Sequence, residues 1–239
     1  MDSDDARLSR YMAKARNAPM VPAPRYGFGE AEAFERSRAF LAAMQRRRSI
    51  RAYSDRPVPW ELIENAVRVA GSAPSGANMQ PWTYVVVSDP ALKTRMRAAI
   101  ETEEHATYAR RASEEWLEAL APLGTDWFKE HITTAPYVAV VFAQVHGIQS
   151  GDSGEALKVR HYYVQESVGI SVGFFLAALA QAGLATLTHT PNPMNVLSEI
   201  LGRPPNERCY VVIPIGYAAE DAAVPAIQKK TLEEILVRR

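Results

Sequence analysis

Short apolar runs alternate along the chain with longer segments in which apolar positions recur every three or four residues. The short runs are rich in β-branched and aromatic side chains, which is typical of buried strands. They are WTYVVVSD (82–89), PYVAVVFAQV (136–145), LATLTHT (184–190) and ERCYVVIPIGY (207–217). The longer segments predict helices over 32–47, 59–71, much of 90–131, a stretch beginning near 161, and 195–202. Strands interleaved with helices indicate an α+β or α/β layer fold.

The remaining segments lack such periodicity. Residues 1–30 are polar and contain Pro, which predicts an N-terminal arm, and residues 31–239 read as one domain without an internal repeat or linker. The stretch HGIQSGDSGEALK (146–158) is rich in Gly and Ser and predicts a loop. The segment 90–132 is heavily charged and interrupted by APLG, so a mobile lid within it is a reasonable expectation.

One stretch imitates a membrane span. Val168–Leu187 has no charged residue, and its length is that of a membrane-crossing helix. Its many Ala and Gly residues, together with Ser171, Gln181 and Thr186, make it only weakly apolar. We therefore predict a buried helix that runs into a strand.

Composition narrows the class of protein. The chain has 239 residues, of which 47% are hydrophobic and 23% charged, the balance of an ordinary globular protein. Lys and Arg together number 27, as do Asp and Glu, so no overall field favours nucleic acid or an acidic membrane surface. The N-terminus lacks the apolar region of a secretory signal, and Cys209 is the only cysteine, so we expect a cytoplasmic protein with Cys209 in the core.

Common catalytic motifs do not occur. The chain contains no GxxxxGK[ST], GxGxxG or GxSxG sequence. Its five His residues have neither the helical spacing nor the Cys partners of metal ligands, so we expect no metal site.

Two clusters have the chemistry of a ligand site. RRRSIRAYS (46–54) places several guanidinium groups beside a hydroxyl, which suits a phosphate, although cations are also favoured at any helix C-terminus. SAPSGANMQPW (72–82) is a turn of small residues that could present backbone N–H groups to a ligand, with Gly76 allowing close approach, or could be only a turn.

Together these clusters make the sequence recognisable. The stretch from Arg46 to Val87 resembles the opening of the nitroreductase-like flavoproteins. GLATLTHTP, ILGRPPNERCYVVIPIGY and VPAIQKKTLEEI then follow in the order and spacing of the iodotyrosine deiodinase branch of that family. The resemblance implies an α+β fold with a central, mostly antiparallel sheet packed by helices. It also implies a domain-swapped homodimer with two FMN sites at the subunit interface.

The resemblance assigns residues to the cofactor. Arg47, Arg48, Ser49 and Arg51 match phosphate and ribityl contacts, and Pro74, Ser75 and Gly76 match a turn along the flavin edge. Thr188, His189 and Thr190 match the segment near the reactive flavin N5, with Thr190 as the hydroxyl donor there. Lys229 stands where the family has an Arg, so the charge is kept but the bidentate fork is lost.

Glu104 and Tyr108 are four residues apart on an expected helix, so their side chains should share one face. Spacing alone favours an ordinary solvated helix face. The resemblance adds Lys129, and makes the three the lid residues that bind a halotyrosine zwitterion. A carboxylate suits an ammonium, while a phenol and a Lys suit a carboxylate.

The implied reaction is reductive dehalogenation of 3-iodotyrosine, or its bromo or chloro relatives, to tyrosine and halide. Electrons would come from NADPH or another reductant through FMN. The backbone N–H of Ala77 would hold the substrate phenolate, and Thr190 would support single-electron steps.

Two alternatives remain open from sequence. One is a general NAD(P)H-dependent nitroreductase or quinone reductase, which needs no clamp for a zwitterion. The other is a flavin-binding or amino-acid-sensing protein without turnover, which would use the same binding residues.

Overall fold

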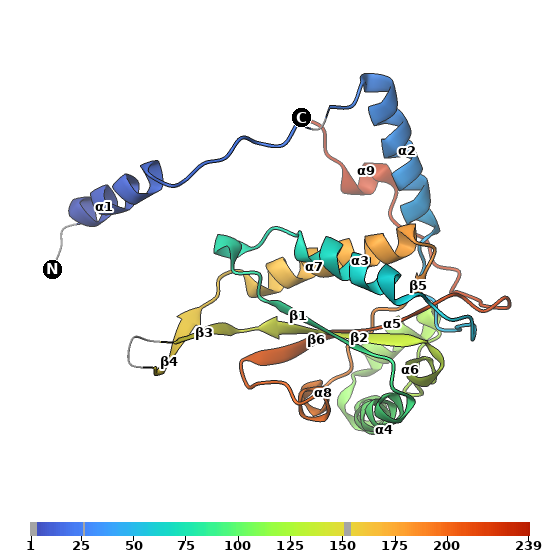
Figure 1. Cartoon of the computed structure of the whole chain (residues 1–239). Coiled ribbons are helices and arrows are strands. Elements are labelled where there is room, and N and C mark those ends of the chain that lie inside the picture. Colours follow the sequence, from blue (N-terminus) through green and yellow to red (C-terminus); the bar gives the residue numbers. More distant parts are fainter. Residues whose placement is uncertain (1–3, 26, 151–153) are drawn as a thin grey trace. The chain divides into compact units, whose positions relative to one another are not determined.

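Hydrogen bonds join four strands into one antiparallel sheet with the order β1-β2-β6-β5 (Figure 1). The strands are β1 (Trp82–Val87), β2 (Tyr137–Gln144), β5 (Ala185–Thr186) and β6 (Glu207–Gly216). This computed structural model describes residues 4–25, 27–150 and 154–239. The predicted strand at 184–190 is shorter than expected, because only two of its residues join β6 as a strand.

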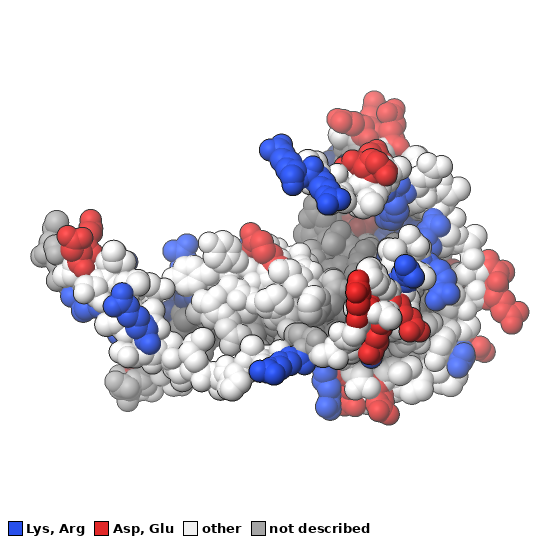
Figure 2. All heavy atoms as spheres, turned by 90° about the horizontal axis from the view of Figure 1, so that it is seen from above, with Lys and Arg blue, Asp and Glu red and all other residues white. Residues whose placement is uncertain are grey.

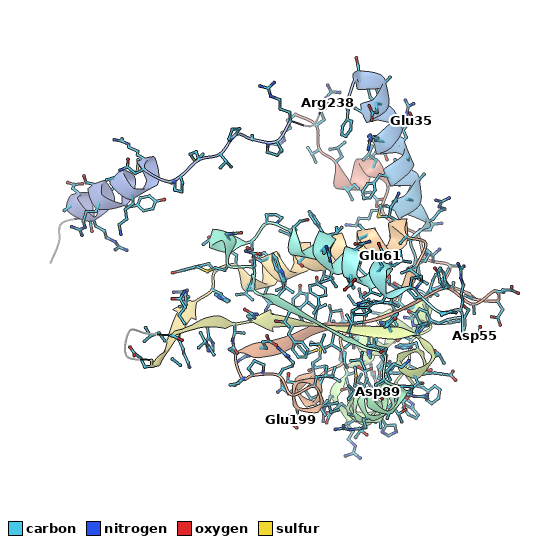
Figure 3. The ribbon with its side chains drawn as sticks, viewed as in Figure 1. Glu35, Asp55, Glu61, Asp89, Glu199 and Arg238 are labelled. Carbon is cyan, nitrogen blue, oxygen red and sulfur yellow. The ribbon has the colours of Figure 1, made fainter. Side chains whose placement is uncertain are left out.

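Helices cover both faces of this sheet. On one face lie α3 (Trp60–Gly71) and α7 (Val164–Gln181), and on the other lie α4 (Pro90–Ala106), α6 (His131–Thr134) and α8 (Asn195–Ile200) (Figure 1). Figure 3 shows Asp89, whose carboxylate accepts hydrogen bonds from the backbone N–H groups of Ala91 and Leu92 at 2.7 and 3.0 Å. This N-cap, followed by Pro90, is why α4 begins where it does.

Side chains that alternate along β2 point into two hydrophobic core layers, one on each face of the sheet. Ala139, Val141 and Ala143 pack with α3 and α7, whereas Val138, Val140 and Phe142 pack with α4, α6 and α8. Successive side chains of a strand point to opposite faces, so a strand buried on both sides reads as one continuous apolar run. The architecture is therefore α+β, with an antiparallel sheet between helical layers.

A β-bulge in β6 interrupts the regular alternation of its side chains between the two faces of the sheet. Val141 pairs with Val211 but Phe142 pairs with Cys209, so Tyr210 is the extra residue. As a result Tyr210 packs with the α3 and α7 side, and Cys209 with the α4 side. Burial raises the pKa of the Cys209 thiol to about 12, so it is a partly buried core residue and a poor nucleophile.

Helix α7 is the part of the apparent membrane span that forms a helix. By length and composition it is the one helix of the described residues that could cross a membrane, which is weak support for such a role. Val168, Phe175 and Leu179 are fully buried on the sheet, whereas Ile170 and Phe174 remain 43% and 40% exposed. This is the predicted buried helix running into β5, with an apolar outer face in addition.

A hairpin of two strands and an N-terminal helix were not expected from the sequence. The interpretation of 146–158 as a loop is wrong for most of its length, since β3 (His146–Ser150) pairs with β4 (Ala156–Arg160) as an antiparallel hairpin. Its residues are mostly exposed, so no alternation of buried side chains marked it in the sequence. Similarly, α1 (Asp4–Arg16) is a helix without buried residues within the predicted polar arm.

The remaining elements are short or terminal. The chain divides after Ala39 into two units, with α2 (Glu30–Arg46) crossing the division. The second unit also contains the turn η1 (Gly76–Asn78), the π turn η2 (Thr107–Arg111), α5 (Glu114–Leu120), η3 (Ala121–Leu123) and α9 (Leu232–Ile235). Side chains of both charge signs are mixed on the face that Figure 2 shows, in line with the equal numbers of acidic and basic residues.

Phe175 tests the core between the sheet and α7. Its ring is fully buried and lies 5.0 Å from the ring of Tyr84. Phe175→Ala should lower the free energy of unfolding by about 3–5 kcal/mol, because it leaves a cavity. Urea unfolding followed by circular dichroism measures this, and Ile148→Ala on the exposed β3–β4 hairpin, where the side chain is 56% exposed, is the control. Equal losses in both variants would contradict this description of the core.

Candidate functional site

The Arg-rich segment after α2 is fixed beside β5. The backbone N–H of Ile50 donates to the carbonyl of Thr186 at 3.1 Å, and Ser49 forms a parallel bridge with Thr186. On the other side of β5, His189 exchanges two backbone hydrogen bonds of 2.8 Å with Val212 of β6. Residues 47–51 and 188–190, far apart in sequence, are thus brought to one end of the sheet.

A first cavity of about 230 Å³ lies at this end. Its lining includes the four residues predicted to contact the FMN phosphate and ribityl chain, Arg47, Arg48, Ser49 and Arg51. Thr188, predicted to lie near the flavin N5, and Lys229, near the C-terminus, also line it. Arg48 donates to the carbonyl of Pro225. Within the described ranges, none of these four cations is paired with a carboxylate. Unpaired cations around a cavity fit an anionic group such as a phosphate.

A second cavity of about 590 Å³ adjoins the first, sharing Arg51, Leu123 and Thr188 with it. Its lining contains the three residues predicted to bind the halotyrosine zwitterion, Glu104, Tyr108 and Lys129. It also contains the three residues predicted to lie near the flavin N5, Thr188, His189 and Thr190. The lining also includes Thr107, Trp116, Leu120 and Thr125, from the π turn to the segment after η3. The first cavity is therefore lined by several cations, and the adjoining second cavity is lined by groups of both charges.

Glu104 and Lys129 form a buried ion pair within the second cavity. Lys129 Nζ lies 3.2 Å from Glu104 Oε2, and the residues are 2% and 8% exposed. Lys129 also donates to the carbonyl of Asp126. Burial alone would raise the pKa of Glu104, but contact with His189 and the charge of Lys129 outweigh it and lower that pKa. Glu104 is thus an anion in a mostly dry site.

Tyr108 reaches this pair from the π turn rather than from α4 itself. The turn is closed by the hydrogen bond from Ala112 N–H to the Thr107 carbonyl at 2.9 Å. Lys129 Nζ lies 5.6 Å from the centroid of the Tyr108 ring. The structure therefore brings Glu104, Tyr108 and Lys129 together as the sequence predicted, although the simple helical spacing does not hold at Tyr108.

Two histidines also belong to this cluster. His189 Nε2 lies 3.6 Å from Glu104 Oε1, and the His189 and His131 rings pack edge to face with centroids 5.7 Å apart. The His189 side chain thus faces Glu104, although the sequence placed this residue with the flavin. His131 was missed entirely, since a lone His at the start of a short helix carries no sequence signal for a site.

The small-residue turn lies elsewhere in the chain. Pro74, Ser75, Gly76 and Ala77 line neither cavity, and η1 lies at the other end of the helical layer from the end of α2 (Figure 1). A Cβ on Gly76 would come within 2.5 Å of the Tyr162 carbonyl oxygen. Within one chain, Gly76 is therefore needed for packing against the start of α7, and the turn does not share a ligand with Arg47–Arg51.

Comparisons with known proteins show the family to which this chain belongs. Residues 44–217 match the model of the nitroreductase family. Iodotyrosine deiodinase of Haliscomenobacter hydrossis is 49% identical over 210 residues, covering 88% of this chain and 93% of that protein. Iodotyrosine deiodinase of Nematostella vectensis is 48% identical, covering 87% and 78%.

A solved structure is also similar. It is oxidized iodotyrosine deiodinase bound to FMN and 3-iodo-L-tyrosine, with a TM-score of 0.69, 27% identity, and coverage of 83% of this chain and 97% of that one. The antiparallel sheet, the adjoining cavities and these similarities lead to one conclusion: the chain belongs to the nitroreductase family and, within it, to the iodotyrosine deiodinases.

Proposed function

We propose that this protein uses FMN to remove the halogen reductively from halotyrosines, such as 3-iodotyrosine, and yields tyrosine and halide. The observation that carries the proposal is the buried Glu104–Lys129 pair in a cavity adjoining one lined by four cations. Support comes from the solved relative, which holds FMN and 3-iodo-L-tyrosine together. A general nitroreductase has no need of such a pair.

The cation-lined cavity fits the phosphate end of FMN. Arg47, Arg48, Arg51 and Lys229 would provide the positive charge there, and Ser49 a hydroxyl. Arg can bind a phosphate through two parallel hydrogen bonds, whereas Lys229 can offer only a point charge. Thr188 and Arg51 line both cavities, so they would lie where the cofactor meets the substrate.

The second cavity fits the amino-acid part of the substrate. Glu104 and Lys129 carry opposite charges, so the pair as a whole is neutral and suits a zwitterion. The substrate ammonium would bind Glu104, while the substrate carboxylate would bind Lys129 and the Tyr108 hydroxyl. One buried ion pair is thereby exchanged for two, which avoids leaving either protein charge unpaired.

FMN, when bound, supplies the electrons that the aromatic carbon–halogen bond requires. The side chains of this protein hold and shield the substrate. The Thr190 hydroxyl would donate beside the flavin, and the Ala77 N–H of a second copy of the chain would donate to the substrate phenolate. Residues 107–128, with Trp116 56% exposed and lining the cavity, would form the lid that closes and excludes water.

The active assembly in this proposal is a domain-swapped homodimer. The turn at 74–77 and the Arg segment lie at opposite ends of the helical layer, so one chain cannot bring both to one cofactor. Apolar side chains of α7 and the C-terminus are exposed, including Ile170, Phe174, Ile235 and Val237 at 43%, 40%, 66% and 76%. A second copy would cover such surfaces. The predicted cytoplasmic location, without nucleic-acid or membrane partners, remains a prediction.

The experiment adds 3-iodotyrosine, tyrosine and a nitroaromatic separately to the purified FMN-loaded protein. Quenching of flavin fluorescence by 3-iodotyrosine, followed by iodide release after reduction with dithionite, is expected. Turnover of the nitroaromatic with NADPH and no response to 3-iodotyrosine would show a general nitroreductase instead. Binding of 3-iodotyrosine without iodide release would show a sensor.

A further inference from the structure

Beside the Glu104–Lys129 pair lie two buried histidines that the proposed chemistry does not use. His131 is 6% exposed, and the His189 side chain is 11% exposed. Both ring nitrogens of His189 and Nε2 of His131 are buried without a hydrogen-bond partner among the described residues. Such groups are rare in folded proteins and call for an explanation.

The geometry around His189 points to Glu104. The backbone of His189 is held by its bridge to Val212, so the ring can move only through its own torsions. Nε2 lies 3.6 Å from Glu104 Oε1, just beyond the usual length of a hydrogen bond. The opposite oxygen, Oε2, is drawn toward Lys129 at 3.2 Å.

Both imidazoles are kept neutral. Burial, reinforced by neighbouring charge, lowers the pKa of His131 to about 3, and burial is also the main cause that lowers the pKa of His189. A neutral imidazole still has one N–H, so His189 can donate to Glu104 without adding a positive charge that would compete with an ammonium.

We propose that His189, packed against His131, is a positioning residue that orients the Glu104 carboxylate for the substrate ammonium. The inference rests on the proposed function and deepens it. When the substrate carboxylate draws Lys129 away, Glu104 Oε1 accepts a hydrogen bond from His189 Nε2–H, and its remaining lone pairs face the ammonium. His189 thus acts on the substrate side of the site, although its neighbours Thr188 and Thr190 are proposed to contact the flavin.

A pH dependence follows from this arrangement. The charged or titratable groups around Glu104 are Arg51, Tyr108, Lys129, His131 and His189. Contact with His189 is one of the causes that lower the pKa of Glu104. Without this contact, only Lys129 opposes the effect of burial, so the pKa of Glu104 would be higher than in the unchanged protein. Substrate binding, which needs ionised Glu104, would then weaken at a higher pH than in the unchanged protein.

The experiment measures 3-iodotyrosine binding to FMN-loaded His189→Leu and His189→Gln by flavin quenching across acidic to neutral pH. Leu removes the donor at similar volume, whereas the Gln amide can still donate to Glu104. We expect His189→Leu to bind about tenfold more weakly, the effect of losing one hydrogen bond to a charged group. Its acid limb should move to higher pH, and FMN affinity should be unchanged. His189→Gln should restore both the affinity and the pH profile.

His146→Leu, on the exposed hairpin, is the matched control and should bind as the unchanged protein does. His131→Leu should shift the acid limb in the same direction by less, and it serves if His189→Leu fails to fold. Equal loss of FMN and 3-iodotyrosine affinity, or no change in any variant, would overturn the inference alone. Failure of the unchanged protein to bind 3-iodotyrosine would overturn the proposed function, and this inference with it.

Discussion

Glu104→Gln is expected to weaken 3-iodotyrosine binding by about a hundredfold while leaving FMN affinity within about twofold. Glu104 is 8% exposed and paired with Lys129 at 3.2 Å, so the change removes the partner of the substrate ammonium from a dry site. It also leaves Lys129 without its buried counter-charge. FMN should be spared, because Glu104 lines only the second of the two cavities. Titration of each ligand by flavin fluorescence measures both affinities.

The control for this experiment is Glu103→Gln. Glu103 precedes Glu104 on α4, but its carboxylate pairs with Arg111 at 2.9 Å on the partly exposed side. We expect its 3-iodotyrosine affinity to stay close to that of the unchanged protein. Parallel loss of FMN and 3-iodotyrosine affinity in Glu104→Gln would mean that the carboxylate supports the site as a whole and is not a substrate contact.

Two defective variants are expected to complement each other in one dimer. The double change Arg47→Ala and Arg48→Ala removes phosphate contacts, and Gly76→Ala distorts the turn because its Cβ would lie 2.5 Å from the Tyr162 carbonyl. Each variant alone should retain little FMN. If each FMN site uses the Arg segment of one copy and the turn of the other, a mixed dimer has one intact site. It should then hold about half the normal FMN.

The mixed dimer is obtained by co-expression with two different affinity tags and successive purification on each. FMN released by heat is then measured per dimer. A mixed dimer as empty as its parents would mean that each site lies within a single chain. Full FMN occupancy in the Gly76→Ala homodimer would mean that the turn does not contact the flavin.

Much of the fold was visible in the sequence because burial imposes a pattern. Strand β2 is apolar on both sides, and its continuous run of Val, Ala and Phe allowed no other interpretation. The hairpin of β3 and β4 is exposed, so the same reasoning had nothing to detect. The bulge at Tyr210 was also beyond the sequence, since it depends on pairing with β2.

The candidate site was likewise only partly predictable from the sequence. Spacing placed Glu104 and Tyr108 near each other, and resemblance to the family added Lys129. The ion pair of Lys129 with Glu104, the approach of His189 and the packing of His131 on it depend on where α6 begins and where β5 ends. These contacts join residues distant in sequence, and no local pattern records them. His189 was accordingly grouped with its neighbours in the chain rather than with its neighbours in space.

The turn that carries Gly76 is attached to α7 by a second contact. The Gly76 N–H donates to Ser167 Oγ at 3.1 Å, and Ser167 lies in the first turns of α7. In the proposed dimer α7 is also an interface helix, so docking of the subunits and presentation of this turn to FMN become one event. By mass action, the apparent affinity for FMN should then rise with protein concentration, and dilution should release the flavin together with the monomers.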